Sequence, residues 1–335
     1  MKILFAIQGT GNGHLSRARE IIPHLLNHGD LDVLVSGTQS DVDIPYIIKY
    51  KRKGISFTFG KNGGIDLIDS IIKLRPFEYL NDIRKCPVDK YDLVINDFEP
   101  ISAWACHLKG LPCFGLSHQA SFLSPKTPRL DKPNKLANFI LRNYAPVTDK
   151  IGFHFQQYDD FIHTPVIRSQ IRKNGLSNKG HITVYLPAYS DEKITNYLNQ
   201  VPDIEWHVFS KHSKKAYYDK NVSIQPIHNN AFVESLCSSD GLITNGGFES
   251  PAEAMYLHKK VLVIPMNNQY EQLCNAKALK LMGCTVVPEI NHNFSNILKQ
   301  WIEYGAPLKV NYYDQLDQIV GNIILKQEQI LRFAY

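Results

Sequence analysis

Short apolar runs alternate with longer amphipathic stretches along the chain, and this alternation is typical of an α/β protein. The runs are rich in Val, Ile and Leu, as strands of a buried parallel sheet are. We expect strands at Ile3–Ile7, Val33–Val35, Tyr91–Ile95, Leu111–Leu116, His181–Leu186, Ile204–Phe209, Ser223–Ile227, Gly241–Thr244 and Val261–Ile264. The pattern lapses at the polar, glycine-containing segment Asn174–Gly180 and then restarts. With 335 residues to place, the sequence predicts two domains, residues 1–165 and 181–312, and a C-terminal helical segment, residues 313–335.

The stretch Asp240–Ala276 carries the clearest candidate chemistry of the second half. An apolar strand ends at a glycine turn, and Ser250-Pro251 is expected to open a helix, with the serine as cap and Glu253 in the first turn. A helix that starts after a glycine turn presents free backbone N–H groups and a positive dipole end. The sequence therefore predicts an anion site, with phosphate as the natural ligand, although many such turns only reverse the chain.

A second polar group follows the next expected strand. Glu271 and Gln272 come shortly after Val261–Ile264, whereas Asn245 and Glu249 belong to the first turn. Successive loops of a parallel sheet open at the same edge, where ligands of such sheets bind. We expect the two loops to form one site.

A similar turn, Gly9-Thr10-Gly11-Asn12-Gly13-His14, follows the first expected strand. A Walker A loop would end in Gly-Lys-Ser or Gly-Lys-Thr, which this turn lacks. A dinucleotide fingerprint would place a third glycine where His14 stands, which weakens that interpretation. The turn can alternatively serve a different ligand and present His14 to it.

The two glycine turns together resemble those of GT-B glycosyltransferases. N-G-G-F-E-S-P-A-E-A followed by P-x5-E-Q-x2-N-A is similar to the donor-sugar signature of the UDP-glycosyltransferase family and of the bacterial GlcNAc transferase that makes the lipid-linked peptidoglycan precursor. G-T-G-N-G-H-L-S-R resembles the N-terminal turn of the same enzymes. The resemblance implies the GT-B fold, an α/β architecture of two Rossmann-like domains facing across a cleft. It also implies that the last helix crosses back to the N-terminal domain.

The resemblance implies a role for each residue of the donor site. The turn Asn245-Gly246-Gly247 and Ser250 would hold the diphosphate, and Glu253 would bind the ribose. Glu271 and Gln272 would bind the hydroxyl groups of the hexose. Glu249 stands where the plant-type pattern has asparagine.

His14 is the candidate general base, because a neutral imidazole can take a proton from an acceptor hydroxyl near pH 7. Asp97, in the loop after Tyr91–Ile95, is the candidate that orients it, and Glu99 is the rival base. His14 can alternatively cap its helix, and Asp97 can serve as a turn residue. Gly11, Gly13 and His118 are expected to line the acceptor side of the cleft.

The resemblance implies transfer of a sugar from a nucleotide-diphosphate sugar, most simply a UDP-sugar, to an acceptor hydroxyl. Inversion at the anomeric carbon and independence from metal and other cofactors are expected. Asp41-Val42-Asp43 matches the metal motif of another glycosyltransferase fold but lies far from the expected phosphates. Two alternatives remain, a non-hydrolysing sugar-nucleotide epimerase and a non-catalytic nucleotide-sugar-binding protein on the same scaffold. The expected acceptor is a molecule with a free hydroxyl group, a saccharide or a lipid-linked molecule.

Composition narrows the class of protein. Hydrophobic residues make up 44% and charged residues 21% of the chain, as in soluble globular proteins. The net charge of +5 is too small to predict a nucleic-acid partner. No run approaches the roughly 20 apolar residues of a membrane span, and the start does not read as a signal peptide. Six cysteines without a C-x-x-C pair favour reduced thiols and a cytoplasmic location.

One stretch leaves peripheral membrane contact open. Asp66–Ile83 is expected to be an amphipathic helix whose apolar face packs on the sheet. With Lys73, Arg75 and Arg84 nearby, part of it could instead touch a lipid-linked acceptor or the inner face of the membrane.

Overall fold

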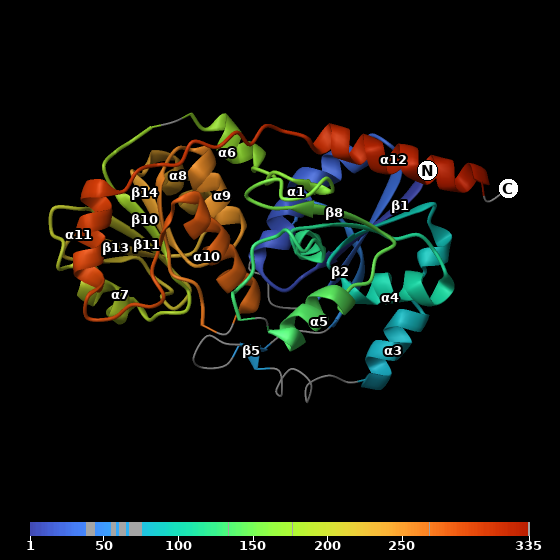
Figure 1. Cartoon of the computed structure of the whole chain (residues 1–335), viewed down its shortest axis with the longest axis horizontal. Coiled ribbons are helices and arrows are strands. Elements are labelled where there is room, and N and C mark those ends of the chain that lie inside the picture. Colours follow the sequence, from blue (N-terminus) through green and yellow to red (C-terminus); the bar gives the residue numbers. More distant parts are fainter. Residues whose placement is uncertain are drawn as a thin grey trace.

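The computed structural model describes residues 1–37, 44–54, 58–59, 65–66, 76–132, 134–175, 177–267 and 269–333. They form two lobes side by side, each built on a seven-stranded sheet (Figure 1). The Asp41–Asp43 motif and residues 67–75 of the expected amphipathic helix lie outside the described residues. Asp66 itself lies in a two-residue strand, so the helix prediction is wrong at that position.

The N-terminal lobe holds the sheet β3-β2-β1-β6-β7-β8-β9, in which every pair of neighbours is parallel. Its elements are β1 (Lys2–Gln8), α1 (Asn12–Leu26), β2 (Asp30–Ser36), β3 (Ile48–Arg52), α3 (Pro76–Arg84), η1 (Val88–Lys90), β6 (Leu93–Asp97), α4 (Pro100–Lys109), β7 (Phe114–Ser117), η2 (Gln119–Leu123), α5 (Lys135–Asn143), β8 (Asp149–Phe153) and β9 (Ile162–His163). A small antiparallel pair, β4 (Thr58–Phe59) and β5 (Ile65–Asp66), stands apart from this sheet.

The C-terminal lobe repeats the design with the order β12-β13-β11-β10-β14-β15-β16. Its elements are α6 (Ser169–Lys173), β10 (Ile182–Tyr185), α7 (Asp191–Leu198), β11 (Trp206–Ser210), β12 (Tyr217–Asp219), β13 (Val222–Pro226), α8 (Asn229–Ser238), β14 (Gly241–Thr244), α9 (Glu249–Tyr256), β15 (Lys260–Val263), α10 (Tyr270–Met282), β16 (Thr285–Val286) and α11 (Phe294–Tyr304). A last helix, α12 (Leu316–Phe333), follows them in the chain. Only the pairing of β12 with β13 is antiparallel among the ladders described in this sheet.

Burial explains why these apolar runs become central strands. Ile3–Ile7 of β1 and all four residues of β14 are buried, because helices cover both faces of a parallel sheet. The expected two-domain α/β architecture is therefore confirmed.

The last helix belongs spatially to the N-terminal lobe. In Figure 1, α12, at the red end of the chain, runs alongside that lobe. Its Asp317 carboxylate lies 2.5 Å from His24 Nδ1 of α1, and Gln327 Nε2 donates to the Asp92 carbonyl at 2.6 Å. Ile319, Val320 and Ile323 of α12 are buried in the core cluster that also contains α1. The chain end thus ties the second lobe to the first.

Among the described helices, none combines the length and apolar character needed to cross a bilayer.

Candidate active site

The carboxyl ends of both sheets face a common cavity of about 890 Å³. Residues of both lobes line it, as expected for loops that open at one edge of each sheet. Of the residues singled out in the sequence, the cavity is lined by Gly11, Gly13, His14, His118, Asn245, Gly247, Ser250, Glu271 and Gln272. The structure brings most of the predicted site together.

The first glycine turn sets His14 into this cavity. Gly11 has φ 92°, a left-handed conformation that favours glycine, and α1 begins at the next residue. A Cβ on Gly13 would meet the Glu249 carboxylate, so the side chain of Glu249 lies directly against this turn. His14 is 8% exposed and lies in the first turn of α1.

His14 and Asp97 form a hydrogen-bonded pair. His14 Nδ1 lies 2.8 Å from Asp97 Oδ1. A charged carboxylate only accepts hydrogen bonds, so Nδ1 carries the proton and donates it. The lone pair is then on Nε2, on the side of the ring where Gln119 Nε2 stands at 3.4 Å. This is the tautomer that a general base requires.

Arg17, one turn along α1, holds the other side of Asp97. Its Nη2 donates to both Asp97 oxygens, at 2.7 and 2.9 Å, and its Nε donates to Oδ2 at 3.2 Å. Burial by itself would raise the pKa of Asp97, but the charges and hydrogen bonds of Arg17 and His14 outweigh it and the pKa is lowered. Asp97 is thus a fully buried carboxylate held in its charged form.

Glu99 is turned away from this pair. Its carboxylate caps α4, accepting from the backbone N–H groups of Ile101 at 2.8 Å and Ser102 at 2.7 Å. Phe98, between the two acids, has φ 55°, a left-handed backbone that is uncommon for a non-glycine residue. Burial raises the pKa of Glu99, although its hydrogen bonds oppose this. Both carboxylate oxygens of Glu99 are therefore engaged in capping α4.

The donor turn differs from the expected helix start. The helix α9 begins at Glu249, so Ser250 is its second residue and not its cap, and that prediction is wrong. Within the described residues, no side chain caps the first turn of α9, and its N–H groups remain available to an anion. Gly246 lies against the backbone carbonyl of Gln272, with no room for a Cβ, and Asn275 Nδ2 donates to the Gly246 carbonyl at 3.1 Å.

Glu253 is covered by Arg168, the residue immediately before α6. Arg168 contacts both of its carboxylate oxygens at 2.5 Å, and Glu253 is 1% exposed. Arg168 lines the cavity and also donates to Asn229 Oδ1 at 2.7 Å. Arg168, not Glu253, is therefore the group of this pair that reaches the cavity.

The second loop presents an acid and an amide, and both side chains have hydrogen-bond partners. Gln119 Nε2 donates to Glu271 Oε2 at 3.1 Å, and the confined surroundings raise the pKa of Glu271 by desolvation. Gln272 Oε1 accepts from the Met266 N–H at 3.0 Å, while Gln272 Nε2 and Asn245 Nδ2 lie 3.3 and 3.6 Å from the Met266 sulfur. The three side chains Asn245, Met266 and Gln272 form one wall of the cavity.

His118 joins the two lobes. Its ring stacks on Phe248 at a centroid distance of 3.9 Å, and its Nε2 lies 3.0 Å from Asn275 Oδ1. Burial lowers the pKa of His118 to about 3, so the ring stays neutral.

Arg17, Gln119 and Arg168 were missed by the sequence reasoning. Arg17 belongs to the quoted N-terminal motif and lies three residues after His14, on the same helix face, which was the available signal. Gln119 and Arg168 carry no local signal, because their partners Glu271 and Glu253 lie 152 and 85 residues away along the chain.

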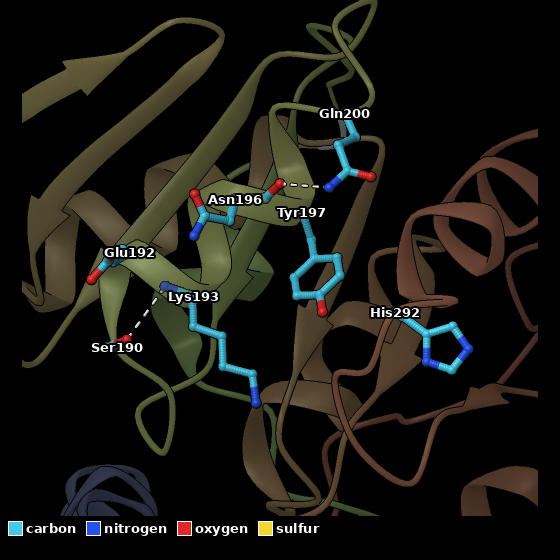
Figure 2. A pocket seen from close by; sticks show the side chains of 7 residues that line it. All are labelled: Ser190, Glu192, Lys193, Asn196, Tyr197, Gln200 and His292. Carbon is cyan, nitrogen blue, oxygen red and sulfur yellow. Dashed lines mark hydrogen bonds between the residues drawn. The ribbon is translucent and has the colours of Figure 1, made fainter.

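A second hollow lies apart from these residues (Figure 2). Its lining comes from α7 and the segments beside it: Ser190, Glu192, Lys193, Asn196, Tyr197, Gln200 and His292. The hydrogen bonds drawn there are local to the helix, from the Lys193 N–H to Ser190 Oγ and from Gln200 to the Asn196 carbonyl. These contacts stabilise α7 and indicate no ligand.

Solved structures share this two-lobed fold. The glycosyltransferase VinC in complex with dTDP matches with a TM-score of 0.56 at 11% identity, over 98% of this chain and 100% of VinC. UGT89C1 from Arabidopsis thaliana complexed with UDP gives 0.57 at 13% identity, over 96% and 94% of the two chains. MurG from Acinetobacter baumannii gives 0.52 at 14% identity, over 97% and 99%. The fold is that of GT-B glycosyltransferases.

Among curated proteins, none matches the chain in sequence. The family model described as glycosyl transferase family 1 matches residues 72–303, more than half of the chain. Together with a cleft that places a histidine–aspartate pair opposite an open helix N-terminus, this match identifies the chain as a member of glycosyl transferase family 1, and thus as a glycosyltransferase.

Proposed function

We propose that the enzyme transfers a sugar from a nucleotide-diphosphate sugar to a hydroxyl group of its acceptor, with His14 as general base. The observation that carries this proposal is the orientation of His14. Its Nδ1 is tied to Asp97, and its Nε2 points to the cavity that also contains the first turn of α9. Asp97 orients the ring and stabilises the imidazolium that forms, whereas Glu99 caps α4.

The leaving diphosphate is proposed to bind at the N-terminus of α9. Ser250 lines the cavity there, and the backbone N–H groups of the first turn carry the positive end of the helix dipole. These groups would stabilise charge as it develops on the leaving oxygen. Attack on the anomeric carbon from the side of His14, opposite the diphosphate, would invert its configuration in one displacement.

Glu271 and Gln272 are proposed to bind the hydroxyl groups of the sugar, since both line the cavity one loop beyond the turn at Asn245–Gly247. UDP is the proposed nucleotide; the dTDP and UDP complexes of VinC and UGT89C1 are consistent with a pyrimidine nucleotide. Glu253 is proposed to act on the nucleotide through Arg168, which covers it.

The acceptor is proposed to carry an apolar part beside its hydroxyl. Helix α5 has no buried residue, yet Leu136, Ile140 and Leu141 line the cavity. Leu136 is 57% exposed and the other two are half-buried. Apolar side chains that line the same cavity as His14 favour a ligand that covers them. A lipid-linked saccharide satisfies this, and would bring the enzyme to a membrane surface. Six buried free thiols are consistent with a reducing, cytoplasmic setting.

Substitution of His14 tests the proposal. Donors are chosen by thermal shift with UDP- and dTDP-sugars, and turnover is followed as nucleotide release in the presence of hydroxyl acceptors. His14→Ala is expected to lower kcat by roughly 10²–10⁴-fold with donor affinity unchanged, the usual contribution of a general base. Asp97→Asn is expected to act in the same direction, and the double variant less than additively.

The matched control is His292→Ala, which removes an exposed histidine of the second hollow and is expected to leave turnover unchanged. Wild-type turnover in His14→Ala would end the assignment. Loss of turnover in Glu99→Gln, with its melting temperature preserved, would transfer the role of base to Glu99.

A further inference from the structure

Arg17 connects the proposed base to the donor-binding helix. While one side of its guanidinium binds Asp97, Nη1 donates to Glu249 Oε1 at 2.6 Å. Arg17 is 3% exposed, so little water competes for these bonds. Asp97 belongs to the N-terminal sheet and Glu249 begins α9, so one cation spans the cleft between two carboxylates.

The ion pair between Arg17 and Glu249 lies where the glycine turn before α1 meets the start of α9. The Glu249 carboxylate lies where a side chain on Gly13 would be, directly beside the glycine turn that carries His14. A lone carboxylate at the N-terminus of α9 would repel a diphosphate that binds there. Paired with Arg17, it presents a compensated charge instead.

We propose that Arg17 is a positioning residue, which sets the charge around the His14–Asp97 pair and is itself balanced by Glu249 of the donor helix. The proposal rests on His14 being the base. Arg17 holds Asp97 so that one of its oxygens faces His14 Nδ1, and Glu249 draws part of the guanidinium's charge away from the imidazole.

The sign of each effect follows from the charge removed. Without Glu249, the imidazolium form of His14 loses a favourable negative neighbour, so the acidic limb of the pH–rate profile moves to lower pH. Without Arg17, the imidazolium loses a repelling cation, and the limb moves to higher pH. The charged and titratable groups facing His14 are Arg17 of its own helix, Asp97 at the end of β6, Glu249 of α9, Glu271 of α10 and His118 after β7. His118 is neutral, and Asp97 and Glu271 are retained in both variants.

The experiment compares Glu249→Gln, Arg17→Gln and the double variant in the full-length chain. The pH dependence of kcat/KM is measured with the donor chosen above, from pH 5 to 9. We expect limb shifts of roughly 0.5–1 pH unit, downward for Glu249→Gln and upward for Arg17→Gln, with the double variant near wild type. Arg17→Lys keeps the charge and is expected to hold the limb closer to wild type than Arg17→Gln, while lowering kcat because lysine cannot bind both acids.

Lys49→Gln is the matched control, because it breaks an ion pair with Asp32 at the surface of the N-terminal lobe. It is expected to leave the profile unchanged. Limbs that coincide in all variants, with lowered kcat alone, would reduce Arg17 to a structural residue and overturn this inference. An active His14→Ala enzyme would instead overturn the proposed function, so the two failures are distinguishable.

Discussion

At the scale of single residues, the site depends on how each buried charge is paired. Asp97, Glu99 and Glu253 are all nearly or fully buried acids, and each has a different partner. Asp97 binds a histidine and an arginine, Glu99 binds two backbone N–H groups, and Glu253 binds an arginine at both oxygens. Removal of one partner from such a group is costly, because an unpaired buried charge remains. The three acids therefore differ in what they can do: Asp97 can orient His14, Glu99 stabilises α4, and Glu253 holds Arg168.

Glu253 gives a prediction at this scale. Arg168 occupies both oxygens of Glu253, so Glu253→Gln is expected to act by displacing Arg168. The variant should therefore lower the affinities for UDP and for 2′-deoxy-UDP by the same factor. Isothermal titration of both nucleotides measures the two factors. A loss confined to UDP would show that Glu253 itself binds the ribose 2′-hydroxyl. Gln200→Ala, at an exposed amide of the second hollow, is the control and is expected to change neither affinity.

At the scale of elements, the two glycine turns explain how backbone serves as a binding group. The turn before α1 needs glycine at Gly11 for its left-handed φ, whereas the turn before α9 needs Gly246 for its approach to the next loop. Both turns lie at carboxyl ends of parallel strands, where helix N-termini converge. At each of these two positions, the conformation or the packing of the protein itself thus requires glycine, independently of any ligand.

Ser250 and Ser190 form a matched pair for testing α9. Ser190 Oγ accepts from the Lys193 N–H and caps α7, whereas Ser250 lies inside α9 and lines the cavity. Ser250→Ala is expected to weaken the binding of UDP by ~1 kcal/mol or more, the scale of a hydrogen bond to a charged group, with little change in Tm. Ser190→Ala is expected to do the reverse, losing about 1 kcal/mol of stability and no UDP affinity. Equal UDP affinity of Ser250→Ala and wild type would remove Ser250 from the phosphate site.

At the scale of the whole molecule, the two lobes share one core. The cluster around α1 continues through Phe248, just before α9, and Ala252 of α9 into Ile319 and Ile323 of α12. The site lies where this shared core meets the cleft, so the distance between base and donor turn depends on packing far from either.

Helix α12 is expected to contribute to the stability of the whole chain. Ile323→Ala removes a buried side chain, 2% exposed, and should lower the free energy of unfolding by about 2–5 kcal/mol. Leu325→Ala, on the same helix but 59% exposed, should cost less than about 0.5 kcal/mol. Urea unfolding followed by fluorescence of Trp104 in one lobe and of Trp206 and Trp301 in the other measures both. Equal costs for the two variants would show that α12 does not pack as described.

The sequence by itself determined the α/β architecture, the central strands of both sheets and a part of the cavity lining. Apolar runs and glycine turns act within a few residues, so a single strand or turn can be inferred from its own composition. His14, Asp97 and the turn at Asn245–Gly247 were found this way, as residues at the carboxyl ends of expected strands.

Only the tertiary structure decided which charged groups meet. Asp97 and Glu99 are two residues apart, and the left-handed backbone at Phe98 turns one to His14 and the other to α4. Arg17 finds Glu249 across the cleft, 232 residues away along the chain. Such pairs depend on the packing of two lobes against each other, and the energy of a buried charge depends on all its neighbours at once. A local pattern of residues contains neither quantity.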